Sequence, residues 1–136
     1  MAPISKMGVM PTLRRATIAD AALITEQRHR MFADNGFTTE ERYREMDAAF
    51  EPWVRRHLAD GTYVGLFLEE EGEVVSAAGI YFMEFPPHWM DPEPLRAYLL
   101  NFYTVPAARG RALASAKQKP ALCGGFRKSC GTRTRT

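Results

Sequence analysis

The chain has 136 residues, of which 46% are apolar and 25% charged, a balance typical of one globular domain. This composition excludes a wholly disordered chain, a collagen-like repeat and a disulfide-dense mini-protein. The longest apolar runs, such as residues 76–85, are too short to span a bilayer. Residues 1–13 also lack the continuous apolar segment of a secretory signal. We therefore expect a cytoplasmic protein without a membrane partner.

Charge is distributed unevenly along the chain. Residues 1–114 contain 12 Lys and Arg against 16 Asp and Glu, a net charge of −4. Residues 115–136 contain six basic residues, no acidic residue and both cysteines. Two cysteines without a nearby histidine do not form a zinc pattern, so no metal is expected. The basic segment has no interleaved aromatic side chains, and we expect no specific nucleic-acid partner.

The first half of the chain predicts a flexible leader, one strand and a helix. Residues 1–12 show no periodicity and are assigned to the leader. A short strand is expected over residues 13–18. Capping residues at positions 17–20 then open a helix. Asn35 and the glycine after it end that helix.

A second amphipathic helix is predicted from about residue 38 to residue 58, with apolar residues at spacings of three and four. Pro52 lies within it and has no N–H to donate. We therefore expect the helix to end near Phe50 and to restart with Pro52 in its first turn. His57 lies on the apolar face and is expected to pack there. His29, on the first helix among arginines, is typical of a solvated face.

The second half predicts three strands. Residues 62–69 are apolar on both faces, as in a central strand, and residues 73–85 form the returning strand of a hairpin. A proline-rich loop at residues 86–94 leads to a fourth strand over residues 96–105. The order β-α-α-β-β-β predicts an α+β fold with a mixed, mostly antiparallel sheet flanked by helices.

Residues 101–114 run from the fourth strand through a small-residue turn into the apparent start of a helix. Free N–H groups and the helix dipole at such a start favour an anion, and small side chains let a phosphate approach the backbone. Many domains have this arrangement without a ligand. On spacing alone, a phosphate-binding site and an ordinary turn without a ligand are therefore equally favoured. The segment is neither a P-loop nor a dinucleotide-binding fingerprint.

The same segment resembles motif A of the GNAT superfamily (Gcn5-related N-acetyltransferases), whose pattern is Arg/Gln-x-x-Gly-x-Gly/Ala. Arg109 and Ala114 match its first and last positions, and Ala112 stands where the family has its middle glycine. The resemblance covers residues 13–115, which we assign to a partial GNAT domain. It implies the GNAT fold, acetyl-CoA as co-substrate and acetyl transfer to an amine of a small molecule or peptide.

The resemblance also assigns roles to residues near the turn. Backbone groups of Phe102, Tyr103 and Thr104 should pair with the pantetheine arm like an added strand. Positive charge from Arg109 lies nearby. The N–H groups of the turn should hold the pyrophosphate; these residues are Gly110, Arg111, Ala112, Leu113 and Ala114.

A GNAT domain should continue after motif A with about 50 further residues of helix and strand, whereas 22 follow Ala114. Because the composition changes at the same point, we expect a truncated or frameshifted chain, with residues 116–136 a disordered or out-of-frame basic tail. The C-terminal half of the fold would then be incomplete. The alternative function is a non-catalytic remnant, or a CoA-binding or self-associating module that forms a homodimer through an exposed sheet edge.

Acetyl transfer to an amine needs a group that takes the amine proton. Glu84, at the end of the third strand between Phe82 and Phe85, is the candidate base, because apolar neighbours favour a carboxyl that can hold a proton. His88 and Asp91 in the proline-rich loop are candidates for the acceptor side. For all three, ordinary exposed residues without a catalytic role are the competing and more frequent interpretation.

Overall fold

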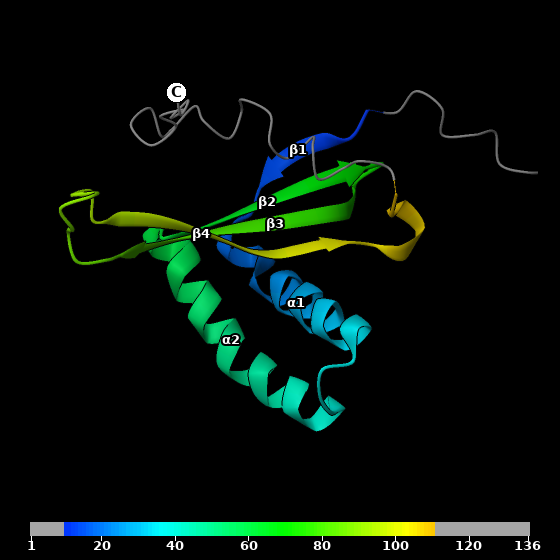
Figure 1. Ribbon diagram of the computed structural model, residues 1–136. Helices are drawn as coiled ribbons and strands as arrows, with labels where there is room; N and C mark the ends of the chain where they lie inside the picture. Colours follow the sequence, from blue (N-terminus) through cyan, green and yellow to red (C-terminus); the bar gives the residue numbers. More distant parts are fainter. Residues whose placement is uncertain (1–9, 111–136) are drawn as a thin grey trace, which may run out of the picture.

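The computed structural model describes residues 10–110 (Figure 1). Its four strands are β1 (Thr12–Arg15), β2 (Tyr63–Glu70), β3 (Glu73–Glu84) and β4 (Leu95–Thr104). The helices are α1 (Ala21–Asn35) and α2 (Glu40–Asp60), with short 3-10 turns η1 (Ile18–Asp20) and η2 (Pro106–Ala108). This order confirms the predicted β-α-α-β-β-β arrangement and the α+β class. The leader and the basic tail lie outside the described residues, except for positions 10–12.

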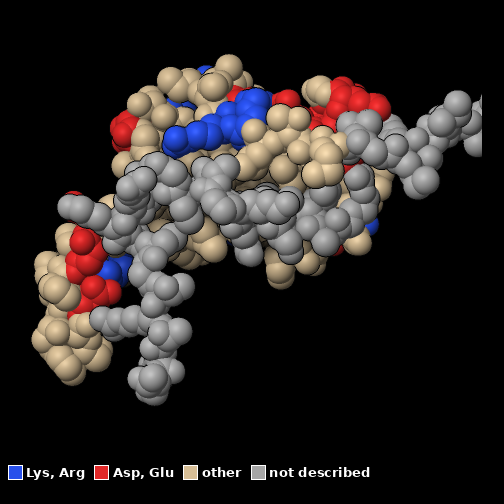
Figure 2. All heavy atoms as spheres, turned by 90° about the horizontal axis from the view of Figure 1, so that it is seen from above, with Lys and Arg blue, Asp and Glu red and all other residues tan. Residues whose placement is uncertain are grey.

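The strands form one antiparallel sheet in the order β1-β2-β3-β4. Both helices lie against the same face of this sheet, and the β3–β4 hairpin extends past the other strands (Figure 1). β2 lies between β1 and β3 and is buried on both faces, as its apolar sequence predicted. Seen from above, the visible described surface carries basic and acidic side chains close to one another (Figure 2).

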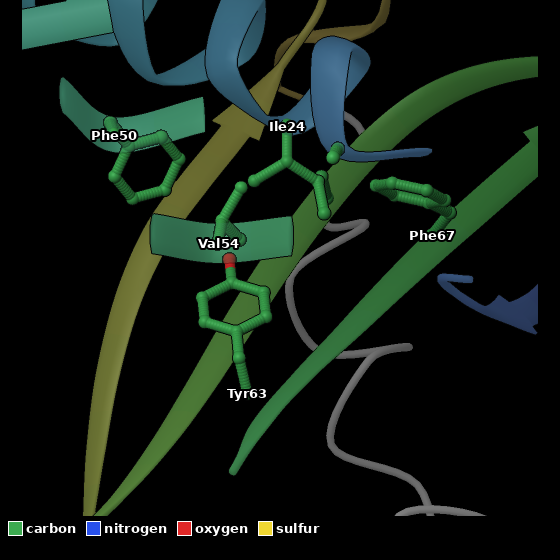
Figure 3. Close-up of a cluster of buried hydrophobic side chains, with 7 residues drawn as sticks. Ile24, Phe50, Val54, Tyr63 and Phe67 are labelled. Atoms are coloured by element: carbon green, nitrogen blue, oxygen red, sulfur yellow. The ribbon is translucent and has the colours of Figure 1, made fainter. Parts of the chain in front are cut away.

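The main core lies between the helices and the sheet. Ile24 of α1 and Phe50 and Val54 of α2 meet Tyr63 and Phe67 of β2 (Figure 3). Burying an aliphatic or aromatic side chain of this size contributes about 1.5–3 kcal/mol relative to leaving it in water. This packing fixes α1 across the sheet, and α1 also contacts β4.

The start of α1 is tied to the sheet by charge. Arg14 of β1 donates to Asp20, with an Nη1–Oδ2 distance of 2.8 Å, and to Glu69 of β2 through Nε at 2.6 Å. Asp20 also accepts from the Thr17 N–H at 2.7 Å. The hydrogen bond from Arg14 lowers the pKa of the Asp20 carboxyl. At the other end, Gly36 adopts φ 64°, the left-handed conformation that closes a helix.

The predicted break in α2 is wrong: one helix runs from Glu40 to Asp60 with Pro52 inside it. Proline removes the hydrogen bond to the carbonyl four residues earlier, here Ala48. Both Pro52 and Ala48 are exposed, so water can hydrogen-bond that carbonyl. The apolar face, including buried Phe50 and Val54, stays in register on both sides of the proline and holds the helix together.

His29 does not lie on a solvated face, contrary to the sequence interpretation. Its Nδ1 lies 2.5 Å from Asp47 Oδ2, and its Nε2 lies 3.1 Å from a Glu40 carboxylate oxygen. These contacts join α1 to α2. The hydrogen bond with Asp47, followed by smaller contributions from Glu40, raises the pKa of His29 above its ordinary value of 6.5. His57 packs as predicted, with its ring 4.3 Å from that of Trp53.

We expect the helix pair to be more stable in mild acid than in mild base. Because the pKa of His29 is raised on folding, its contribution is complete below pH 6.5 and is lost as the pH rises through the folded-state pKa. Urea unfolding of the wild type and His29→Gln between pH 5.5 and 9 measures this difference. His29→Gln should be less stable than the wild type at low pH, and the difference in the free energy of unfolding should shrink as the pH rises. A difference that does not change with pH would contradict the role given to His29. Asp47→Asn, which removes the partner of His29, should reduce the stability at low pH in the same way.

Candidate functional site

β4 carries an irregularity opposite the middle of β3. Tyr103 pairs with Ala77 and Leu100 with Gly79, so β4 has two residues where β3 has one. Asn101 lies in this bulge with φ 57°, a left-handed backbone that asparagine tolerates better than most residues. A bulge of this kind bends the strand and redirects a side chain. The side chain that it redirects is the buried amide of Asn101, 5% exposed.

The Asn101 amide connects three elements. Its Nδ2 donates to the Tyr63 hydroxyl of β2 at 3.0 Å, and its Oδ1 accepts from Arg28 Nη1 of α1 at 2.7 Å. Burial raises the pKa of the Tyr63 phenol, so the ring stays neutral at physiological pH. We call these three residues the bulge cluster.

Gly79 makes the cluster possible. Tyr63 extends across β3 to reach Asn101, and a Cβ built on Gly79 would lie 2.2 Å from the Tyr63 hydroxyl oxygen. No side chain fits in that space without displacing the ring. A glycine is therefore needed here because the Tyr63 ring approaches the β3 backbone closely, and not because of the glycine's own backbone angles.

Arg28 is the charged member of the cluster. Its guanidinium carbon lies 4.9 Å from the ring centre of Phe32 and 4.8 Å from that of Phe50, within the range of cation–π attraction. Burial lowers the pKa of Arg28. Its Nε is buried and has no hydrogen-bond partner within residues 10–110. Among residues 10–110, no carboxylate forms an ion pair with this guanidinium.

The end of β4 presents backbone on the side away from β3. The Val105 N–H donates to the Val75 carbonyl at 3.0 Å, so the Thr104 carbonyl, on the same peptide unit, points away from β3. Arg109 Nε donates to that carbonyl at 3.0 Å, and Arg109 Nη2 lies 2.6 Å from Asp34 Oδ2. On the other side of the strand, Ser76 Oγ donates to the Tyr103 carbonyl at 3.1 Å. Arg109 therefore lies beside the turn after β4, and its charge is paired with Asp34.

A groove of about 290 Å³ follows this end of β4; its lining residues are Met31, Asp34, Asn35, Phe102, Tyr103, Thr104 and Arg109. The groove lies between the C-terminal end of α1 and the three strand residues that were predicted to contact pantetheine. It gives an elongated ligand a surface alongside the strand.

After β4 the chain makes the 3-10 turn η2, and the helix predicted to start after the turn lies beyond residue 110, outside the described residues. The Ala108 N–H donates to Val105 at 2.9 Å and the Arg109 N–H to Pro106 at 3.3 Å, so these two amides are satisfied within the turn. Gly110 follows with φ 80°, a conformation that favours glycine. The other predicted pyrophosphate contacts, Arg111, Ala112, Leu113 and Ala114, lie outside the described residues, as does the break expected near residue 115.

Glu84 lies at the far end of β3, opposite Leu95. It is exposed, which agrees with the competing interpretation of an ordinary carboxylate at a strand end and not with a carboxyl enclosed by its aromatic neighbours. Glu84 lies five positions after Gly79, the β3 residue that faces the bulge. That separation is about 17 Å at the rise of an extended strand, too far for direct proton transfer at the bulge.

His88 and Asp91 are brought together at the tip of the β3–β4 hairpin. Each backbone N–H donates to the other residue's carbonyl, at 3.1 and 2.9 Å. Asp91 Oδ2 also lies 3.0 Å from Arg96 Nη1. Both residues are exposed, and the tip projects away from the helices (Figure 1). These contacts stabilise the loop and keep both candidates distant from the bulge cluster.

Residues 10–110 contain no group of three or more His, Cys, Asp or Glu side chains arranged to hold a metal ion. No helix in this range is both long enough and apolar enough to cross a bilayer.

Comparison with known proteins identifies the fold family. The sequence profile of the acetyltransferase (GNAT) family matches residues 25–116. The chain belongs to the GNAT acetyltransferase family. The GNAT match begins within α1 and includes α2, the bulge cluster and the turn after β4. It ends within two residues of the change in composition.

Solved structures agree with the GNAT assignment. A GCN5-related N-acetyltransferase from Ralstonia eutropha JMP134 is 30% identical, with a TM-score of 0.75 over 84% of this chain and 74% of its own. A predicted acetyltransferase with acetyl-CoA from Clostridium acetobutylicum is 27% identical, with a TM-score of 0.71 over 79% and 68%. An aminoglycoside acetyltransferase from an uncultured soil metagenomic sample shares the fold at 18% identity, with a TM-score of 0.56 over 87% and 74%. No curated protein sequence matches this chain.

The sequence did not single out the three residues of the bulge cluster. In the sequence, Arg28 looks like an ordinary solvent-exposed arginine of a helix. Tyr63 looks like an ordinary core residue of a strand. Asn101 carried the one usable signal, since asparagine inside an apolar strand is unfavourable and often marks an irregularity. The GNAT resemblance located the strand but did not reveal this irregularity.

We expect Tyr63→Phe to destabilise the protein by about 1–3 kcal/mol, because it leaves the Asn101 Nδ2 group buried without an acceptor. Tyr81→Phe is the matched control: it lies on the neighbouring strand and its hydroxyl has no partner in residues 10–110. Urea unfolding of both variants measures the difference. Equal stabilities would show that the Tyr63–Asn101 bond contributes nothing to the bulge.

Proposed function

We propose that this chain binds acetyl-CoA along the outer side of β4 and transfers the acetyl group to the amine of a small molecule or peptide. The observation that carries the proposal is the outward Thr104 carbonyl at the end of β4, beside a groove and followed by Gly110 at φ 80°. A strand with outward backbone groups can pair with an amide-containing arm as it would with another strand. Membership in the GNAT family and the acetyl-CoA present in the Clostridium acetobutylicum structure support it.

The assignment fixes a direction for the donor. The pyrophosphate would lie at the turn from Gly110 onward, and the pantetheine arm would pass Thr104, Tyr103 and Phe102. The thioester end would then reach the bulge at Asn101. To pair with the Thr104 carbonyl, the arm shares or displaces the hydrogen bond from Arg109 Nε.

The reaction itself is a simple acyl transfer. The neutral amine nitrogen attacks the thioester carbonyl carbon, a C–N bond forms, and the C–S bond breaks with its electron pair going to sulfur. One proton leaves the nitrogen and one is taken up by the thiolate. Glu84 stays a prediction for the base; its separation from the bulge means that it would act through water. His88 and Asp91 stay predictions for an acceptor that extends toward the hairpin tip.

A first test uses paired glycines with matched geometry. Gly110 and Gly72 adopt φ 80° and 79°, and a Cβ on either would contact nothing within 4 Å. Alanine should strain both turns to a similar extent, by about 1 kcal/mol. We expect Gly110→Ala to weaken CoA binding about tenfold by calorimetry, because the pyrophosphate contacts begin there, and Gly72→Ala to leave it unchanged. Absence of CoA binding to the wild type at millimolar concentration would reject the donor assignment.

A second, non-catalytic candidate is self-association through β4. Leu95, Tyr98 and Leu99 of this strand are 43%, 56% and 59% exposed, and within residues 10–110 β4 pairs with one strand, β3. An apolar strand with an available side favours pairing with another copy.

The expected result is a dimer of the wild type in sedimentation experiments at tens of micromolar. Leu99→Lys should convert it to monomer, because a charge on an edge strand opposes strand pairing. Ala59→Lys, on exposed α2 surface, is the control for added charge. A monomeric wild type would exclude this candidate.

A further inference from the structure

Arg28 differs from the other arginines of residues 10–110 in being partly buried without a carboxylate counter-ion. Six arginines form ion pairs with carboxylates: Arg14, Arg30, Arg44, Arg55, Arg96 and Arg109. The remaining ones, Arg15, Arg42 and Arg56, are exposed. Arg28 is partly buried between α1, α2 and β4 and has no carboxylate partner in this part of the chain.

The protein compensates this charge incompletely. Phe32 and Phe50 provide cation–π contacts, and Asn101 accepts one hydrogen bond from Nη1. Nε has no partner although it is buried, and Nη2 has no acceptor among the described residues. A guanidinium offers Nε and Nη2 along one edge, which matches the two oxygens of a carboxylate. That edge of Arg28 is the unused one.

The position of Arg28 links it to the acyl transfer. Under the proposed function, on which this inference rests, the thioester end of the donor lies at the Asn101 bulge. Arg28 is hydrogen-bonded to Asn101 at 2.7 Å. Tyr98, three positions earlier on β4, is exposed. An acceptor amine that reaches the thioester must therefore bring the rest of its molecule close to this guanidinium.

We propose that Arg28 binds a carboxylate of the acceptor, so that the substrate is an amine that also carries a carboxylate, as amino acids do. The carboxylate accepts from Nη2 and, after a side-chain adjustment that opens the buried edge, from Nε. Binding then supplies the missing counter-ion and orients the amine toward the bulge. Neutral amines of the same size lack this interaction and bind more weakly.

The test measures binding in the absence of acetyl-CoA, so that it does not depend on turnover. The probes are glycine, β-alanine, 4-aminobutanoate and 5-aminopentanoate, each paired with its primary amide. This series varies the spacing between amine and carboxylate and removes the carboxylate charge at constant size. Wild-type protein should bind at least one acid about 30-fold more tightly than its amide, the effect expected for a sheltered charged pair.

Three variants separate recognition from folding. Arg28→Gln should abolish the preference for acid over amide, and Arg28→Lys should keep part of it, because the charge remains without the two-pronged geometry. Arg55→Gln, on exposed α2 surface, should behave as the wild type. Should Arg28→Gln fail to fold, Arg28→Lys still decides the matter, since a purely structural role leaves the acid-to-amide ratio unchanged.

Several results would overturn the inference. The first is equal binding of acids and amides by the wild type. The second is an unchanged preference for the acid in the folded Arg28 variants. The third is no binding of any acid when the probes are used at 100 mM. The donor assignment is checked separately by CoA calorimetry. Loss of CoA binding with an intact acid preference would reject the acetyl-transfer proposal and keep the carboxylate site. In turnover experiments, Arg28→Gln should raise the KM of the acid acceptor about 30-fold and leave the KM of acetyl-CoA unchanged.

Discussion

The buried amide of Asn101 is the interaction on which the arrangement of the site depends. It satisfies Tyr63 of β2 and Arg28 of α1 at once, and it does so from a left-handed residue in the bulge of β4. Removing the amide would leave the Tyr63 hydroxyl and Arg28 Nη1 without this partner, at a cost of about 1–3 kcal/mol for each group. The bulge, the position of α1 and the course of β4 are therefore fixed together.

The dependence extends to Gly79, which has no polar atom in the cluster. Tyr63 reaches Asn101 only because β3 has no side chain in its way. One small residue on the middle strand thus permits a hydrogen bond between its two neighbours. It also explains why the bulge lies at this place along β4, since Gly79 pairs with Leu100 immediately beside it.

Sequence reasoning predicted the order of the elements because that order depends on local signals: apolar periodicity, capping residues and the Asn35–Gly36 helix end. It failed at Pro52, where packing of Phe50 and Val54 outweighed the loss of one solvent-exposed hydrogen bond. It also failed at His29, because the acidic partners come from α2 and not from neighbouring residues. The bulge depends on the register of β4 against β3, which no local pattern encodes. The GNAT resemblance predicted the position of the strand and the turn, whereas the bulge cluster could be recognised only in the three-dimensional structure.

Arg109 and Arg28 show why a count of arginines cannot locate the available charge. Arg109 is the residue that the motif predicts beside a pyrophosphate, yet Asp34 already lies 2.6 Å from its guanidinium. Arg28 belongs to no motif, yet it lacks a carboxylate partner among residues 10–110 and is partly buried. An ionic interaction is stronger in such a site because the dielectric constant is lower than in water. Because Asp34 already pairs with Arg109, the proposed donor site relies on backbone N–H groups of the turn and not on this guanidinium. Under our proposals, the thioester end of the donor lies at the bulge beside Arg28, and this arginine discriminates between acceptors by their charge.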